Sequence, residues 1–168
     1  MEVKKLNKNF YLNFSIVLFI FLIDRISKLY VIQKDKLNFN SEIYSSKFLN
    51  IHLIWNEGIA FGLFSFNEDY LYNFLTFLIF IVIIFIVFII RKSDPVRKYA
   101  LLLVFGGALG NFFDRLIYKA VPDFIDFHVG NFHWFIFNVS DIFITIGIIL
   151  MIIIEIINKP EATNNEKI

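Results

Sequence analysis

The residues of this chain that could do chemistry are carboxylates and amides that interrupt long hydrophobic runs. Two short segments show this most clearly, residues 107–115 (GALGNFFDR) and residues 137–141 (FNVSD), and the segment 121–123 (VPD) lies between them. A charged side chain at the depth of a bilayer costs at least about 2.5–3.5 kcal/mol on insertion scales. Such residues therefore point to catalysis or ion movement rather than to packing alone.

Paired aspartates are the catalytic groups that the sequence supports best. Two carboxylates in one site cannot both ionise cheaply, so one stays protonated while the other acts as a base. Such a pair can activate water and protonate a leaving amine, which is peptide hydrolysis. Asp141 is the expected first member, and its partner is Asp114, Asp123 or Asp126. Asp114 adjoins Arg115, which favours a structural ion pair, so chain position favours Asp123.

Other catalytic chemistries have weaker support in the sequence. The chain has no cysteine, which excludes thiolate nucleophiles and disulfides. Ser27 and Lys28 are adjacent, so their side chains diverge on a helix and do not form a serine–lysine pair. His128 and His133 are five residues apart in an expected hairpin, without a matching ligand cluster. Structural or interfacial roles are expected for these histidines and for His52, and no metal or cofactor is expected.

The elements that position these groups must lie in a membrane. Hydrophobic residues make up 58% of the chain and charged residues only 18%, compared with about 25% charged in soluble domains. A net charge of +1 gives no electrostatic case for nucleic acid as a partner. We therefore expect an all-α membrane protein: one domain, residues 1–168, forming a four-transmembrane-helix bundle. The spans are expected at about residues 10–32, 71–90, 99–118 and 139–157.

Lysine and arginine residues predict the orientation of this bundle. Nine of the sixteen lie in the two tails and the loop between the second and third spans, and four lie in the opposite loops, residues 33–70 and 119–138. By the positive-inside rule both termini are cytoplasmic. At about 1.5 Å per residue, Asp24 and Asp114 then lie about 21 and 22 Å from the inner ends of their helices. Asp141 begins a helix that starts outside, so all three share one level in the outer third of the bilayer.

The two outer loops are expected to form a small β-sheet. Residues 48–55 have the composition of a strand, and glycines in residues 56–62 permit a turn. Residues 124–129 and 132–135 flank a Gly-Asn dipeptide, which predicts a hairpin. In the third span, Gly106 and Gly110 form a small-xxx-small pair that allows a neighbouring helix to approach closely.

Five sequence blocks, in this order, resemble the lipoprotein signal peptidases (signal peptidase II), bacterial integral membrane aspartic peptidases. The blocks are residues 24–28 (DRISK), 56–62 (NEGIAFG), 106–115 (GGALGNFFDR), 121–125 (VPDFI) and 137–141 (FNVSD). Each block alone is weak evidence for the family. Five blocks in this order, in a chain with four expected spans and a basic inner side, are specific evidence. The resemblance covers nearly the whole chain.

The resemblance implies removal of signal peptides from diacylglyceryl-modified prolipoproteins, just before the lipidated cysteine. It implies catalytic roles for Asp123 and Asp141, a site near the outer leaflet of the bacterial cytoplasmic (inner) membrane, and contact with membrane lipid. We expect a monomer. The residues expected to bind substrate or support the dyad are Asp24, Lys28, Asn56, Gly58, Asn111, Asp114, Arg115 and Asn138.

The sequence departs from the family pattern at three positions. Phe135 and Ile136 replace a usual proline and alanine, and Ser140 replaces a usual alanine and adds a hydroxyl that must find a partner. No carboxylate is lost, so activity is expected to survive. The main alternative is a proton-coupled transporter, which also uses intramembrane aspartates but needs polar groups through the full membrane depth. A second alternative is a noncatalytic assembly factor whose buried charges only pair with one another.

Overall fold

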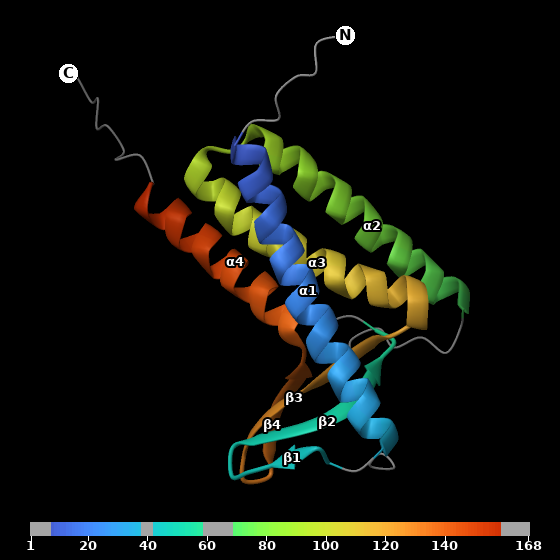
Figure 1. The fold of residues 1–168 in the computed structure, drawn as a ribbon. Helices are drawn as coiled ribbons and strands as arrows, with labels where there is room; N and C mark the ends of the chain where they lie inside the picture. Colours follow the sequence, from blue (N-terminus) through green and yellow to red (C-terminus); the bar gives the residue numbers. More distant parts are fainter. Residues whose placement is uncertain (1–7, 38–41, 59–68, 159–168) are drawn as a thin grey trace, which may run out of the picture.

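The described part of the chain consists of four helices and a four-stranded antiparallel sheet. A computed structural model describes residues 8–37, 42–58 and 69–158. The elements, in chain order, are α1 (Lys8–Leu37), β1 (Tyr44–Ser45), β2 (Leu49–Asn56), α2 (Asp69–Lys92), α3 (Pro95–Tyr118), β3 (Val121–Val129), β4 (Phe132–Phe137) and α4 (Val139–Ile157). The sheet lies at the end of the helix bundle away from the first turn of α1 and the last turn of α4 (Figure 1).

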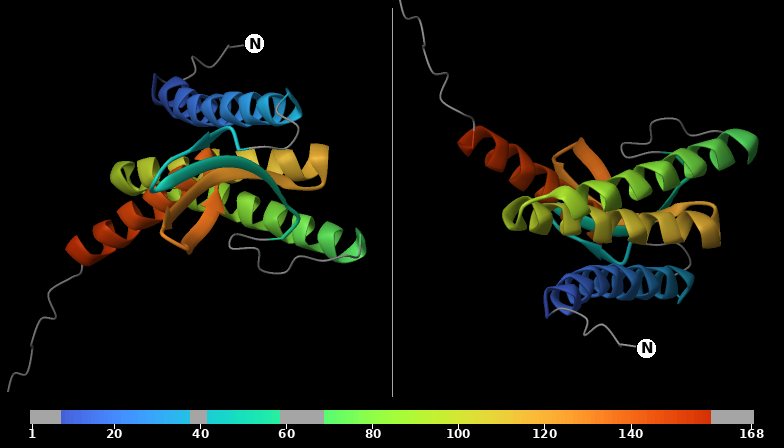
Figure 2. Two further views of the ribbon diagram at one scale, coloured as in Figure 1. Left: turned by 90° about the horizontal axis from the view of Figure 1, so that it is seen from below. Right: turned by 90° about the horizontal axis from the view of Figure 1, so that it is seen from above.

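Helix α3 is the central helix and packs against α1, α2 and α4. Helices α1 and α2 lie on opposite sides of it (Figure 2). Glycines permit the close approach: a Cβ on Gly106 would lie 3.0 Å from Ile20 of α1, and one on Gly107 would lie 2.5 Å from the carbonyl oxygen of Ser140 in α4. Small residues at such crossings let helix backbones come close together.

The sheet has the order β1-β2-β3-β4 and confirms the predicted hairpin, with Gly130 at φ 61° in its turn. Strand β2 also agrees with the predicted strand to within one residue. However, strand β3 begins at Val121, three residues before the predicted start at residue 124, so it includes Asp123. Asp123 pairs in register with Ile54 of β2, so it belongs to the sheet.

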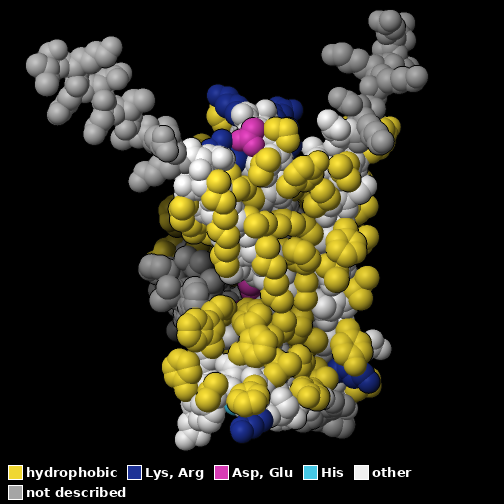
Figure 3. All heavy atoms as spheres, turned by 90° about the vertical axis from the view of Figure 1, so that its left-hand side faces the viewer, with side chains coloured by type: hydrophobic (Ala, Val, Ile, Leu, Met, Phe, Trp, Pro, Cys, Tyr) yellow, Lys and Arg dark blue, Asp and Glu magenta, His cyan; other side chains and the backbone are white. Residues whose placement is uncertain are grey.

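The surface of the helix bundle is largely apolar. Apolar side chains cover the middle of the face in Figure 3, with lysine and arginine side chains near its two ends. Large aromatic residues of α2, such as Phe74, Phe77 and Phe85, are exposed. Lipid can solvate such a belt at low cost, whereas water cannot. The belt therefore fits a protein that resides in a membrane.

Three described helices are long and apolar enough to cross a membrane, at Tyr70–Lys92, Pro95–Tyr118 and Val139–Ile157. Helix α1 is not among these three, and its charged residues are Lys8 at its start and a group between Asp24 and Lys36, with none in residues 9–23. Yet Asp24 and Lys28 of α1 are turned inward and are 1% and 0% exposed. At about 1.5 Å per residue, its 30 residues span about 45 Å.

Candidate active site

Asp123 and Asp141 line the same cavity, which has a volume of about 330 Å³. Asp123 comes from β3, and Asp141 comes from the first turn of α4. The same cavity is lined by Asn56 of β2 and by Asn111 and Arg115 of α3. Thus two sheet strands and two helices bring together polar residues from four separate parts of the sequence.

The two alternative partners for Asp141 do not line this cavity. Asp114 and Asp126 are both buried, but their carboxylates bond to cationic or imidazole groups elsewhere. Of the three aspartates that the sequence left open, only Asp123 shares the cavity with Asp141.

Asp123 is held by two side-chain amides. Its Oδ1 accepts a hydrogen bond from Asn138 Nδ2 at 2.6 Å, and its Oδ2 accepts one from Asn56 Nδ2 at 2.9 Å. Only 4% of the residue is exposed. Burial, followed by the nearby charge of Asp141, raises the pKa of Asp123 from its ordinary value of 3.8 to about 7, although the two amide hydrogen bonds oppose this shift. This carboxyl can therefore hold a proton near neutral pH.

Asp141 is held by one side-chain amide and one backbone amide. Its Oδ1 accepts a hydrogen bond from Asn111 Nδ2 at 2.7 Å, and its Oδ2 accepts one from the backbone N–H of Asn138 at 3.1 Å. The second bond belongs to a capping box, in which the Asn138 side chain also accepts the backbone N–H of Asp141. Helix capping thereby fixes the position of the Asp141 carboxylate.

The amides of Asn56 and Asn111 are each oriented by a second hydrogen bond. The Oδ1 of Asn56 accepts the backbone N–H of Gly58 at 2.9 Å, which leaves its Nδ2 to face Asp123. The Oδ1 of Asn111 accepts Lys28 Nζ at 2.9 Å, which leaves its Nδ2 to face Asp141. Each aspartate therefore accepts a hydrogen bond from an asparagine amide whose orientation is fixed by a second hydrogen bond.

A buried network of charges lies behind Asn111, between α1 and α3. The ammonium of Lys28 donates to Asp24 Oδ2 at 2.9 Å and to Asp114 Oδ2 at 2.6 Å. Arg25 donates to the other Asp114 oxygen at 2.5 Å. Asp24 in turn accepts the backbone N–H of Ser140 at 2.9 Å, one of the N–H groups that the start of α4 leaves without a partner inside the helix. The network thus joins three helices.

The prediction that Asp114 forms an ion pair with Arg115 was wrong, because Asp114 pairs with other residues. Adjacent side chains on a helix diverge, so Asp114 turns to Arg25 and Lys28, whereas Arg115 faces the cavity. Arg115 Nη2 donates to the carbonyl oxygen of Gly58. Residues 59–62 of the second sequence block lie outside the described residues.

Arg25 is the site residue to which sequence reasoning gave no role. Its guanidinium bonds Asp114 and lies over the rings of Phe113 and Tyr118, 5.3 and 5.9 Å from their centres. Cation–π contact of this kind partly replaces the water that a buried guanidinium loses. The only signal for it in the sequence is its position inside a hydrophobic span, next to Asp24.

The three departures from the family pattern surround the site. The Ser140 hydroxyl is buried and has no hydrogen-bond partner among the described residues. It faces Gly110, where an added Cβ would also lie 2.6 Å from Asp24 Oδ2. Phe135 and Ile136 line the cavity. Helix α4 nevertheless begins in a regular way, because the capping box forms without the proline.

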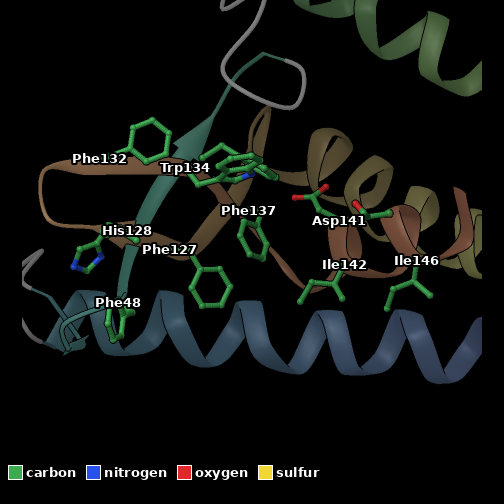
Figure 4. Close-up of a pocket in the computed structure, with 12 residues that line it drawn as sticks. Phe48, Phe127, His128, Phe132, Trp134, Phe137, Asp141, Ile142 and Ile146 are labelled. Carbon is green, nitrogen blue, oxygen red and sulfur yellow. The ribbon is translucent and has the colours of Figure 1, made fainter. Parts of the chain in front are cut away.

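An apolar groove of about 550 Å³ adjoins the cavity. Figure 4 shows Phe127, Phe137, Ile142 and Ile146 along it, with Asp141 at the α4 side. Asp141, Phe135 and Thr145 line both the groove and the cavity. An apolar group bound in the groove would therefore lie beside one of the two carboxylates.

The histidines differ from the sequence-based expectation in one respect. The expectation that His128 and His133 lack a matching ligand cluster was wrong, because Asp126 lies within reach of both. Asp126 belongs to the same strand as His128 and bonds His133 Nδ1 at 2.8 Å. His52 is not part of this group among the described residues.

Comparison with known proteins supports the resemblance. Residues 16–157 match the family model of signal peptidase (SPase) II. The lipoprotein signal peptidase of Pelagibacter ubique (strain HTCC1062) is 49% identical over 165 residues, covering 98% of this chain and 99% of its own. That of Anaplasma phagocytophilum (strain HZ) is 37% identical over 139 residues, covering 83% and 88%.

A solved structure of a bacterial membrane enzyme has the same fold. It superposes with a TM-score of 0.73 at 28% identity, covering 88% of this chain and 94% of its own. A second solved bacterial membrane enzyme gives a TM-score of 0.68 at 31% identity. From the family match and these relatives we conclude that the chain belongs to the signal peptidase (SPase) II family of peptidases.

Proposed function

We propose that this chain is an aspartic endopeptidase that removes signal peptides from diacylglyceryl-modified prolipoproteins by cleaving just before the lipidated cysteine. The observation that carries the proposal is the shared cavity of Asp123 and Asp141, in which each carboxylate receives oriented amide donors. The names of the relatives, lipoprotein signal peptidases, support the substrate class.

In the proposed mechanism the two aspartates share one proton. The ionised carboxylate accepts a proton from a water molecule as its oxygen attacks the carbonyl carbon of the scissile bond. The protonated carboxyl hydrogen-bonds the carbonyl oxygen, and a proton then passes to the leaving amine as the C–N bond breaks. The pKa of Asp123, near 7, allows this carboxyl to carry a proton at physiological pH. Asn56, Asn111 and Asn138 hold the carboxylates in place.

The substrate is proposed to enter from the lipid on the sheet side of the bundle. Four helices, α1 included, would span the bacterial cytoplasmic (inner) membrane, with both termini in the cytoplasm. Since Asp24 and Lys28 of α1 are buried, their charges do not argue against a membrane-spanning role. The acyl chains of the lipidated cysteine fit the apolar groove beside Asp141, and the sheet would face the outside.

The transporter alternative has less support. The buried charged side chains among the described residues lie toward the sheet end, on the last third of α3, the second half of α1 and strand β3. A proton path would need such groups through the whole depth of the membrane. The assembly-factor alternative leaves Asp123 and Asp141 lining one cavity, with no cationic hydrogen-bond partner for either among the described residues.

The test is cleavage of a synthetic diacylated precursor peptide by the purified, full-length protein in detergent. Asp123→Asn and Asp141→Asn should each lower kcat/KM at least about 100-fold, the scale of general acid–base catalysis. Glu155→Gln is the matched control, because it makes the same carboxylate-to-amide change at the far end of α4. Full turnover by either aspartate variant would exclude the dyad. Equal cleavage of the peptide without its lipid would exclude the proposed lipid requirement.

A further inference from the structure

The β3–β4 hairpin brings together three metal-ligating side chains that the proposed dyad does not use. Asp126, His128 and His133 each offer one ligand atom, and these atoms lie within 4.8 Å of one another. We propose that they bind one divalent transition-metal ion, with Zn²⁺ as the expected ion. The inference does not depend on the proposed peptidase mechanism.

The register of the two strands creates the cluster. Asp126 and His128 are two residues apart in β3, so their side chains share a face of the sheet. Asp126 pairs with Ile136, whereas His128 pairs with His133, so β4 contains one extra residue between these pairs. Without this bulge, Trp134 would stand opposite His128. The bulge therefore places a second imidazole there, as bulges often redirect side chains.

The contacts within the cluster are close. His133 Nδ1 lies 2.8 and 3.0 Å from the two carboxylate oxygens of Asp126. The rings of His128 and His133 are stacked, with centroids 5.1 Å apart and an interplanar angle of 22°. The side chain of Asp126 is 1% exposed, whereas that of His133 is 52% exposed. A fixed carboxylate thus lies under an imidazole that an ion can reach from solvent.

A second observation points to a ligand. The Nδ1 atom of His128 is buried and has no hydrogen-bond partner among the described residues. A buried polar atom left unsatisfied costs about 1–3 kcal/mol. Coordination of a metal ion by a neutral imidazole nitrogen would use the lone pair that is otherwise unsatisfied. His128 lies at the end of the groove away from Asp141 in Figure 4, so this cluster is separate from the dyad.

Two imidazoles and a carboxylate form a donor set typical of zinc and other first-row ions. Tetrahedral ligand atoms about 2.1 Å from one ion are about 3.4 Å apart, so the present 4.8 Å spread needs a shift of up to about 1.4 Å. Water would complete the coordination. The ion would clamp β3 to β4 on the hairpin that carries Asp123 nearer its other end.

Binding can be tested directly with Zn²⁺ and Co²⁺ on the full-length protein in detergent, after removal of any polyhistidine tag. We expect one Zn²⁺ per chain by calorimetric titration, visible absorption bands when Co²⁺ is bound, and a rise in Tm with Zn²⁺. His128→Gln and His133→Gln should each weaken Zn²⁺ binding at least about tenfold. His52→Gln is the matched control and should bind like the wild type, because His52 lies on the neighbouring strand outside the cluster.

Folding is checked by circular dichroism without metal, so that a misfolded variant is not read as a lost ligand. The Co²⁺ spectrum of the wild-type protein does not depend on any variant. Absence of Co²⁺ bands and of a Zn²⁺-induced rise in Tm in the wild type would overturn the proposal and leave only a structural Asp126–His133 hydrogen bond. Binding that survives in the His128→Gln/His133→Gln double variant would also overturn it.

Discussion

Asn138 contacts both aspartates of the cavity: its side-chain amide lies 2.6 Å from Asp123 Oδ1, and its backbone N–H lies 3.1 Å from Asp141 Oδ2. The residue is fully buried and is the N-cap of α4. One residue thus couples the start of a helix to the relative position of two carboxylates on different elements.

Replacing Asn138 should separate helix capping from the contact with Asp123. Asn138→Ala should cost about 1 kcal/mol of stability as a lost cap and lower kcat/KM at least about tenfold. Asn138→Ser can still cap the helix but cannot reach Asp123, so it should recover the stability and not the activity. Thermal unfolding and peptide cleavage measure the two effects. Recovery of activity by serine would show that only the cap matters.

The stability of the protein should depend on pH through Asp123. Its pKa is about 7 in the folded state and 3.8 for an ordinary carboxyl, so between these values the folded chain binds more protons than the unfolded chain. The contribution of Asp123 to stability is therefore present below about pH 4 and is lost as pH rises to about 7, by at most about 1.4 kcal/mol per pH unit. The Tm of Asp123→Asn relative to the Tm of the wild type should therefore rise between pH 5 and pH 8. A constant difference would contradict the raised pKa.

The same pKa predicts the alkaline limit of activity. A dyad that works with one shared proton loses that proton as Asp123 ionises. We expect kcat/KM to fall above about pH 7, measured with the diacylated peptide under conditions where the protein stays folded. Activity that holds steady up to pH 9 would argue against a shared proton on this pair.

Asp114→Asn should lower stability as well as activity. Asp114 is fully buried and accepts hydrogen bonds from Lys28 and Arg25, and the neutral variant leaves part of this charge unbalanced. Breaking a buried ion pair costs about 3–5 kcal/mol. Thermal unfolding beside Asp123→Asn provides the comparison. An Asp114→Asn protein that is inactive but normally stable would favour Asp114 as the catalytic partner of Asp141.

Ser140→Ala should stabilise the protein. The Ser140 hydroxyl is buried without a partner among the described residues, and removal of such a group recovers about 1–3 kcal/mol. Ser27→Ala is the matched control, because the Ser27 hydroxyl donates to the Asp24 carbonyl oxygen at 2.8 Å and its loss should not stabilise. Thermal unfolding of both variants in the same detergent measures the two changes in Tm. Equal changes would contradict the claim that the unpartnered Ser140 hydroxyl destabilises the protein.

Local sequence was sufficient to predict the secondary structure of the site. Hydrophobic run lengths predicted α2, α3 and α4, and the Gly-Asn dipeptide predicted the turn between β3 and β4. These features depend on residues close together in the chain, where helix length, strand composition and turn geometry act directly. The sequence blocks also indicated Asp123 and Asp141, which line one cavity in the structure.

The partners of the buried groups were decided only by tertiary structure. Asp114 bonds residues 86 and 89 positions away rather than its neighbour Arg115. His133 meets Asp126 because a bulge shifts the register of β4 by one residue. Hydrophobic patterning determines which elements form and how they face lipid. The pairing of charges depends on helix rotation and strand register, which are set when the whole chain packs.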